Sequence, residues 1–342
     1  MVELNGKKIL VTFLMHLGDL TLTTPFIHAL RKAAPDSHIT MLVDEKLKDV
    51  VLFNPYLDEV VTIDKKGRDN SILSLWACSR HLSKLDFDVL INLHPNERCS
   101  FIDAMTSVKL RTGTTHKIFK WFWDVFTPLD RSMHAADMYL DVLQQLGVQD
   151  LSNNGLEIFP GEEHFLEAEL FWQEQNITDQ DKLIGFNIGS AVPTKRWPPE
   201  RFAEVADIFA AKGYKTVFFG GPMDEEMVAE ATGYMQTRPI IATGHFAIGG
   251  LAAAMRRCCL IITNDSGPMH VAISQKVPIV AMYGPSNPKL YGPYTKDAVI
   301  VTVQPPCQGC ADGMKHSCDD LQCMSRMTVE QVVAAAEKML EK

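Results

Sequence analysis

The polar run at positions 264–267 follows the apolar residues 260–263 and precedes His270, so it carries the strongest chemical signal in the chain. Residues 260–263 are typical of a buried parallel strand, and Pro268 suits the first turn of a helix. The polar turn would then lie at a helix N-terminus, where backbone N–H groups and the helix dipole favour an anion such as phosphate. An ordinary capped turn, with His270 packed on the sheet, would explain the same pattern.

Two further polar turns follow predicted strands. Lys195 and Arg196 come shortly after the strand expected at 183–188, and they put two fixed positive charges beside the hydroxyl of Ser190. This combination suits a pyrophosphate, whereas a solvated pair of basic residues is the simpler alternative. The carboxylate of Asp224, in the next turn, is expected either to accept ribose hydroxyls or to cap a helix.

Asp19 follows the first predicted strand, residues 8–13, at the edge where open parallel sheets carry their ligands. A catalytic role and a role as the N-cap of the following helix are both compatible with its position. The turn has one glycine, Gly18, and lacks the G-x-G-x-x-G spacing. A dinucleotide in this half of the chain is therefore not expected.

Strand and helix patterns alternate through both halves of the chain, which is typical of right-handed parallel α/β layers. Strands are expected at 8–13, 39–43, 60–63, 87–93, 183–188, 216–219, 240–242, 260–263 and 278–283. Helices are expected at 20–34, 45–53, 71–82, 97–106, 199–211, 224–236, 248–257 and 328–340. The expected fold class is α/β, with two Rossmann-like, doubly wound parallel-sheet domains.

The domain organisation follows from the same alternation. We expect an N-terminal domain over 1–165, a polar linker over 166–182 and a C-terminal domain over 183–327. The last helix, 328–342, begins at a plausible N-cap and would pack on either domain. A cleft at the domain interface would be the natural ligand site.

Composition excludes some classes of function. The 342 residues are 46% hydrophobic and 22% charged, an ordinary globular inventory. The net charge of −9 argues against a general nucleic-acid binder. No apolar run reaches the roughly 18 residues of a membrane span, and the first residues do not resemble a signal peptide, so we expect a cytoplasmic protein.

Two further segments are each compatible with more than one role. A turn-rich loop carries four thiols, which suggests a structural zinc site, disulfides or simply reduced cysteines: Cys307, Cys310, Cys318 and Cys323. The segment 109–126 combines aromatic residues with four basic ones: Lys109, Arg111, Lys117 and Lys120. It is expected either to contact an anionic lipid surface or to bury its aromatics in the first domain.

Four segments, taken in this order, resemble glycosyltransferase family 9, the heptosyltransferases of lipopolysaccharide core assembly. They are Gly18-Asp19, Lys195-Arg-Trp-Pro198, Gly220-Gly-Pro222 and Asn264-Asp-Ser-Gly-Pro-Met-His-Val-Ala272. The resemblance implies a GT-B architecture, with the acceptor in the first domain and the nucleotide sugar in the second. It also implies inverting transfer without a metal ion.

By this resemblance Asp19 is the general base, while Ser190 and Lys195 hold the donor phosphates. Asp265, Ser266, Gly267 and His270 would close around the sugar and the pyrophosphate. Phe246 is expected either to form the wall that binds the base or to be a core aromatic. The catalytic set is thus Asp19, Lys195 and His270, and the donor-binding set is Ser190, Lys195, Arg196, Asp224, Phe246, Asp265, Ser266, Gly267 and His270.

The expected function is an inverting, metal-independent transfer of a heptose-type sugar from ADP-heptose, or a related nucleotide sugar, to a lipopolysaccharide inner-core acceptor. No cofactor is expected for catalysis, and zinc would be structural only. We expect a monomer in peripheral contact with the cytoplasmic face of the inner membrane. A nucleotide-sugar epimerase of the same fold and a non-catalytic sugar-nucleotide binding module are the alternatives.

Overall fold

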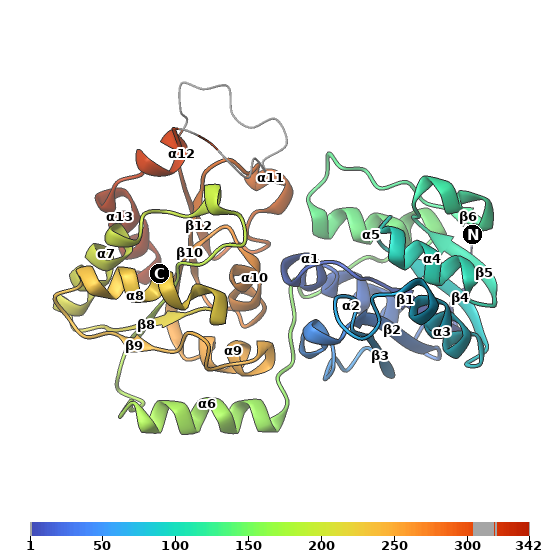
Figure 1. The fold of residues 1–342 in the computed structure, drawn as a ribbon, viewed down its shortest axis with the longest axis horizontal. Helices are drawn as coiled ribbons and strands as arrows, with labels where there is room; N and C mark the ends of the chain where they lie inside the picture. Colours follow the sequence, from blue (N-terminus) through green and yellow to red (C-terminus); the bar gives the residue numbers. More distant parts are fainter. Residues whose placement is uncertain (1, 304–317, 319, 342) are drawn as a thin grey trace. The chain divides into compact units, whose positions relative to one another are not determined.

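A computed structural model describes residues 2–303, 318 and 320–341. The chain divides into two compact units, Met1–Phe159 and Pro160–Lys342. Each unit is built on one six-stranded parallel sheet with helices on both faces (Figure 1). The expected α/β class with two doubly wound sheets is confirmed.

The first sheet has the strand order β3-β2-β1-β4-β5-β6, and its neighbouring strands are all parallel. Its strands are β1 (Lys8–Thr12), β2 (His38–Asp44), β3 (Glu59–Ile63), β4 (Phe87–Asn92), β5 (Val108–Gly113) and β6 (Val125–Phe126). The strand order reverses between β1 and β4. In open α/β sheets, ligands bind outside the carboxyl ends of the strands at such a switch point.

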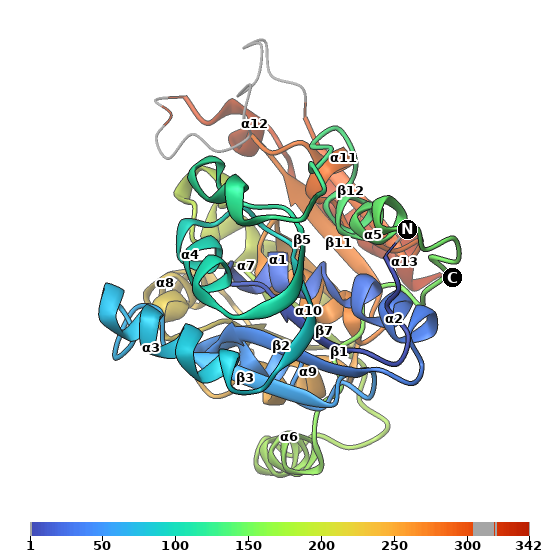
Figure 2. The same ribbon diagram turned by 90° about the vertical axis from the view of Figure 1, so that its right-hand side faces the viewer.

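Helices cover both faces of this sheet, with α3 and α4 on one side and α2 and α5 on the other (Figure 2). The helices are α1 (Leu17–Thr21), α2 (Thr24–Ala33), α3 (Ile72–Ser83), α4 (Glu97–Met105) and α5 (Ala135–Leu146), with short 3₁₀ helices η1 (Glu45–Val50) and η2 (Lys117–Phe122). Apolar residues of β1 and β4, such as Leu10 and Leu90, pack against Leu75 of α3 and Ile102 of α4.

The second sheet repeats the same plan in the order β12-β11-β10-β7-β8-β9. Its strands are β7 (Leu183–Asn187), β8 (Lys215–Phe219), β9 (Ile240–Ile241), β10 (Cys258–Asn264), β11 (Ile279–Tyr283) and β12 (Ala298–Thr302). The first three strands of this unit run from β7 outward to β9, and the next three run from β10 outward to β12. The switch point therefore lies between β7 and β10.

Long and short helices surround the second sheet. The last of them, α13, begins after the N-cap Thr328, which accepts a hydrogen bond from the backbone N–H of Gln331, as expected for a helix start. The helices are α6 (Glu162–Glu174), η3 (Pro193–Lys195), α7 (Pro199–Ala211), η4 (Pro222–Asp224), α8 (Glu225–Tyr234), α9 (Ile248–Met255), α10 (Gly267–Ser274), α11 (Pro288–Tyr291), α12 (Gln322–Ser325) and α13 (Val329–Leu340). Helix α13 packs on the second sheet beside α7.

The structure differs from the sequence expectation at several elements. The helix expected at 20–34 is two helices, because Pro25 lies in the first turn of α2, where its missing N–H is tolerated. The segment 166–182, expected to be a linker, contains most of α6. The N-cap of α1 is His16, so the expectation that Asp19 caps this helix is wrong.

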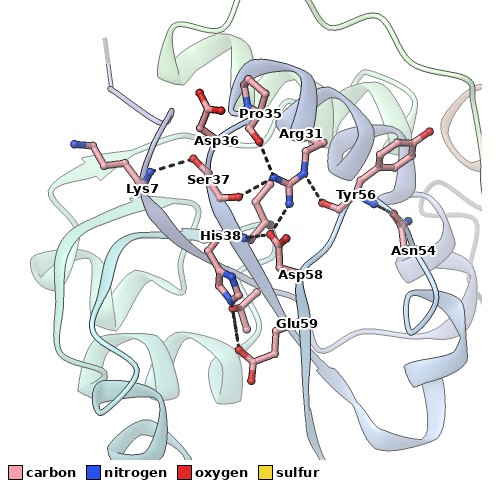
Figure 3. Close-up of polar contacts among 12 residues, drawn as sticks. Lys7, Arg31, Pro35, Asp36, Ser37, His38, Asn54, Tyr56, Asp58 and Glu59 are labelled. Atoms are coloured by element: carbon pink, nitrogen blue, oxygen red, sulfur yellow. Dashed lines mark hydrogen bonds and ion pairs between the residues drawn. The ribbon is translucent and has the colours of Figure 1, made fainter.

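The amino edge of the first sheet is held by a network around Arg31 of α2 (Figure 3). The Arg31 guanidinium donates to the backbone oxygens of Tyr56 at 3.1 Å and Ser37 at 2.7 Å, and it pairs with Asp58. Asp58 also accepts a hydrogen bond from the N–H of Ile39 at 2.7 Å. The polar groups at the amino edge are therefore used in contacts within the unit. We expect ligand-binding groups at the carboxyl edge.

Candidate active site

The carboxyl ends of β7 and β10 are tied together by asparagine side chains. Asn187, the last residue of β7, donates through Nδ2 to Thr263 Oγ1 at 3.0 Å and to Ser266 Oγ at 2.8 Å. Both asparagine and threonine are buried, so these bonds form away from water. These hydrogen bonds consequently hold the ends of β7 and β10 together at the switch point of the second sheet.

Asn264, the last residue of β10, positions the turn that carries Lys195. Its Nδ2 donates to the carbonyl of Ile188 at 2.7 Å, and its Oδ1 accepts from the backbone N–H of Trp197 at 3.0 Å. The Trp197 indole is fully buried and donates to the carbonyl of Met327 at 3.1 Å. Tryptophan in the Lys-Arg-Trp-Pro segment thus anchors the loop to the core.

This anchoring brings Lys195 to Asp265, although the sequence predicted each from a separate turn. The Lys195 Nζ lies 2.7 Å from Asp265 Oδ2, and the two side chains are only 13% and 6% exposed. Ser286 Oγ donates to the same carboxylate oxygen. Burial, reinforced by the nearby negative charge of Asp265, raises the pKa of Tyr283 well above its usual value.

The ion pair therefore fixes an ammonium group at the end of β10. A buried charge pair contributes orientation more reliably than net stability, because desolvation offsets much of its attraction. The Lys195 ammonium is held where an arriving phosphate could share it with Asp265. Asp265 in turn is held by both Lys195 and Ser286.

The polar turn continues into α10, as expected from Pro268. Ser266 is the N-cap of this helix and Gly267 is its first residue. His270 is buried within the same helix. The N-terminus of α10 thus follows directly after Asp265, and its dipole adds positive potential at the same place.

Other predicted donor-site residues have structural partners. Arg196 Nε donates to the carbonyl of Ser190 at 2.8 Å, so its guanidinium braces the loop between the two residues. The buried Asp224 accepts from the N–H of Gly221 at 2.9 Å, and its carboxylate fills the space that a side chain at Gly189 would need. The role of Asp224 in closing these turns is clear, and its contact with ribose stays a prediction.

Phe246 lies just before α9, where it packs against Phe171 of α6 with ring centroids 5.0 Å apart. The His245 ring contacts the same Phe171 ring in a tilted arrangement, with centroids 4.6 Å apart, and Phe246 itself remains partly exposed. An aromatic group packed on one side and open on the other is compatible with both expected roles.

At the switch point of the first sheet, the central strands are joined by a buried acid from a helix. Asp103 of α4 accepts hydrogen bonds at Oδ2 from Thr12 Oγ1 at 2.9 Å and from Asn92 Nδ2 at 2.6 Å. Thr12 ends β1 and Asn92 ends β4, so this carboxyl group joins the two central strands. Complete burial raises the pKa of Asp103 to about 8, which keeps it protonated at neutral pH.

Asp19 lies in α1, the short helix that follows β1. Its Oδ2 is 3.4 Å from Nδ1 of His16, and its side chain is 27% exposed. His94 follows β4, and burial lowers its pKa to about 4 while the charge of Asp19 acts in the opposite direction. Asp19 is thus a partly exposed carboxylate at the carboxyl edge of the first sheet.

The loop between β1 and α1 is fixed by Lys65, which the sequence did not single out. Lys65 Nζ donates to the carbonyls of Leu14 at 3.0 Å and Met15 at 2.7 Å, and it lies 3.1 Å from Asp44 Oδ2. Asp44 ends β2, so the contact links the backbone leading to Asp19 with the neighbouring strand.

The basic and aromatic segment 109–126 is divided between core and surface. Trp123 is buried and donates to the carbonyl of Thr112 at 3.0 Å, whereas Trp121 is 94% exposed. Among the basic residues, Lys109 pairs with Asp88 at 2.7 Å and Arg111 donates to the carbonyl of Asp103 at 3.0 Å. Lys109, Lys117 and Lys120 are exposed, whereas Arg111 is half-buried.

The cysteine cluster cannot be described as a unit, because Cys307 and Cys310 lie outside the described residues. Cys318 is an exposed free thiol, and Cys323 is half-buried. Within residues 2–303, 318 and 320–341, no group of three or more histidine, cysteine or acidic side chains is arranged to hold a metal ion. In the same part of the chain, no helix is both long and apolar enough to cross a membrane.

Two doubly wound parallel sheets of identical strand order, one in each unit, make up the two Rossmann-like domains of a GT-B architecture. The family model for glycosyltransferase family 9 (heptosyltransferase) matches residues 75–318. The chain therefore belongs to glycosyltransferase family 9, as the resemblance predicted.

Individual proteins agree with this assignment. The chain is 53% identical to a crystal structure of a family 9 glycosyl transferase from Veillonella parvula, which covers 99% of both chains with a TM-score of 0.92. It is 24% identical to lipopolysaccharide heptosyltransferase 3 of Escherichia coli K12, over 94% of this chain and 95% of that protein. The structure of the E. coli ADP-heptose lps heptosyltransferase II shares the fold, with 21% identity, 98% coverage of both chains and a TM-score of 0.79.

Proposed function

We propose that this glycosyltransferase moves a heptose-type sugar from ADP-heptose to a lipopolysaccharide inner-core acceptor, with inversion at the anomeric carbon. The observation that carries the proposal is the buried Lys195–Asp265 pair at the N-terminus of α10. The heptosyltransferase relatives supply the sugar and the class of acceptor by their names.

The donor half of the reaction would belong to the second unit. The leaving nucleoside diphosphate gains negative charge in the transition state, and Lys195 with the backbone N–H groups at the start of α10 would stabilise that charge. Ser190 lies in the loop that Arg196 braces and would offer its hydroxyl to a phosphate. His270 and Asp265 would meet the sugar and the pyrophosphate.

The acceptor half would belong to the first unit. One displacement at an anomeric carbon requires a single base to take the proton of the acceptor hydroxyl. Asp19 is the partly exposed carboxylate at the switch point of the first sheet, so we assign it this role. Direct displacement then exchanges the C–O bond to phosphate for a C–O bond to the acceptor, with inversion.

The proposed reaction needs no divalent cation, because Lys195 and the α10 N-terminus supply positive charge to the leaving group. Turnover should therefore persist in a chelator, after purification in the same chelator. Loss of turnover that returns on adding magnesium would contradict this part of the proposal.

The donor is tested by calorimetry against ADP, UDP, GDP and CDP, followed by transfer assays with the matching nucleotide sugars. ADP should bind most tightly, and free ADP should be released only when an acceptor glycan is present. Preference for another nucleotide would replace the proposed donor. Acceptor-independent interconversion of nucleotide sugars would instead indicate the epimerase alternative, and binding without turnover would indicate a non-catalytic module.

A lipid-linked acceptor would bring the enzyme to the cytoplasmic face of the inner membrane. Lys117 and Lys120 are exposed basic residues of the segment predicted to make this contact, and the third exposed lysine, Lys109, is paired with Asp88. Lys120 Nζ lies 4.4 Å from the ring centroid of Phe126, so its charge is held over an aromatic at the surface. We propose a monomeric enzyme that associates with the membrane reversibly through this region.

A further inference from the structure

The solvent-facing side of α3 begins with large apolar residues. Ile72, Leu73 and Trp76 are 72%, 78% and 51% exposed. The opposite side of the helix is ordinary core and buries Leu75, Ser79 and Leu82. The outer side of a helix on a globular unit is usually polar, so these three side chains require an explanation.

The 3₁₀ helix η2 exposes a second apolar group made of Ile118, Trp121 and Phe122. Contacts between side chains place the starts of α3, α4 and η2 along one edge. Arg98 of α4 bonds to Asn70, just before α3, and Glu97 of α4 lies 3.8 Å from His116, just before η2. All three elements follow strands of a parallel sheet, so this edge is the carboxyl edge that also carries Asp19.

The charge on these two elements is positive. Neither α3 nor η2 contains an aspartate or a glutamate. The outer side of α3 ends in Arg80, whose guanidinium lies 5.8 Å from the Trp76 ring centroid, and Lys84 follows at the C-cap. Lys117 and Lys120 supply the charge on η2. Apolar side chains beside basic ones, with a tryptophan between them, are typical of a helix that lies in a membrane interface.

Helix α6 of the second unit shows that exposed apolar residues alone would not make this argument. It exposes Leu166 and Leu170 by 60% and 50%, but it carries five glutamates within its thirteen residues. An anionic surface would repel that helix. The combination of apolar exposure with positive charge distinguishes α3 and η2.

We infer that Ile72, Leu73 and Trp76 of α3 insert, together with η2, into the headgroup region of an anionic bilayer. The sequence pattern had pointed to the segment around η2 and not to α3. The inference rests on the proposed function, in which the acceptor is lipid-linked. It adds a second contact that would hold the carboxyl edge of the first sheet against the membrane that presents the acceptor.

The test is cosedimentation of the full chain with vesicles of phosphatidylcholine containing about one quarter phosphatidylglycerol. The double variant Ile72→Ser/Leu73→Ser should bind these vesicles at least about tenfold more weakly, because two large apolar side chains no longer enter the bilayer. The matched control Leu166→Ser/Leu170→Ser should bind like the wild type. Equal binding by the α3 variant and the wild type would overturn the inference, as would equal loss in both variants.

A second pair of measurements separates this inference from the proposed function. The α3 variant should transfer sugar to a soluble, delipidated acceptor at the wild-type rate, which also shows that it is folded. If no acceptor is glycosylated while vesicle binding still depends on α3, the proposed function is wrong, but the inference that α3 binds the membrane is supported. If sedimentation velocity shows that Ile72 and Leu73 instead join two copies of the chain, the membrane assignment of α3 is wrong.

Discussion

The two switch points share a strand order and differ in how their side chains are held. At the second, Lys195 and Asp265 are buried against each other, and asparagine amides fix both flanking strands. At the first, Asp19 is partly exposed, and its Oδ2 lies 3.4 Å from Nδ1 of His16. The strands below it are joined by a protonated acid, Asp103.

This difference fits two different chemical tasks. A group that stabilises a leaving phosphate acts through a fixed position, because reorganisation in the transition state would weaken its electrostatic effect. A base must reach a proton on a second substrate, so it needs access more than it needs burial. The same fold can thus supply a rigid cation in one unit and an open carboxylate in the other.

The largest expected effect is at the open carboxylate. Asp19→Asn keeps the shape of the side chain but removes the base, so turnover should fall by on the order of 10²- to 10⁴-fold. Donor affinity, measured by calorimetry, should change little. The control Glu97→Gln removes an exposed carboxylate from the first turn of α4, at the same edge, and should retain turnover on a soluble acceptor. A near-normal rate for Asp19→Asn at saturating substrates would show that Asp19 is not the catalytic base.

The next effect concerns the rigid cation. Lys195→Ala should lower turnover by on the order of 10²-fold and also weaken donor binding, because leaving-group charge is greater in the transition state than in the ground state. Lys195→Arg should retain more activity, since the charge is kept. Lys212, which pairs with Glu337 at the surface of the same unit, provides the control Lys212→Ala. Equal loss in the alanine and arginine variants would show that geometry, and not charge, matters at this position.

A third prediction concerns the two clamps, the side chains that join the central strands at each switch point. Only the clamp in the first unit should make the stability of the fold depend on pH. The pKa of Asp103 is about 8 in the folded chain, above its ordinary value of 3.8, so the folded state holds a proton that the unfolded state releases. This contribution to stability is full below about pH 4 and is lost as the pH rises towards 8. The amides of Asn187 and Asn264 do not titrate, so the second clamp has no such dependence.

Scanning calorimetry between pH 5 and pH 8 would measure the effect. The melting temperature of the wild type should fall with rising pH relative to that of Asp103→Asn, by on the order of 5 °C over this interval. Glu97→Gln should follow the wild type. Parallel curves for the wild type and Asp103→Asn would mean that Asp103 is ionised in the folded chain.

The smallest expected effect is on the exposed edge of the first unit. Replacing Lys117 and Lys120 with serine should weaken transfer to a vesicle-embedded acceptor by roughly thirtyfold at low salt, since each lysine contributes about 1 kcal/mol near an anionic surface. Transfer to a soluble glycan should be unchanged. Equal loss on both acceptors would mean that the lysines contact the glycan itself, and no loss on either would leave them as solvated surface charges.

The local sequence determined much of this protein. Alternating apolar runs and helical patterns gave the α/β class, and the polar residues that end the apolar runs identified Asp19, Lys195 and Asp265. Pro268 and Thr328 marked helix starts, and both are confirmed. These signals are local, because strand burial, helix caps and proline each act within a few residues.

A further local signal was available for the clamps. Three strands at the switch points, β4, β7 and β10, end in an asparagine: Asn92, Asn187 and Asn264. An amide at the end of a buried strand must find partners on neighbouring backbone or side chains. This repeated position would have indicated which strand ends are joined.

The partners themselves were decided by the tertiary structure alone. Trp197 and Asn264 are 67 residues apart in the sequence, and their hydrogen bond is what brings the Lys195 turn to Asp265. The neutrality of Asp103 depends on complete burial among residues from two strands and a helix. The outward position of Ile72 and Leu73 depends on which side of α3 meets the sheet. Such contacts leave no periodic trace in the sequence, because packing selects them only after the strands have paired and the helices have crossed over them.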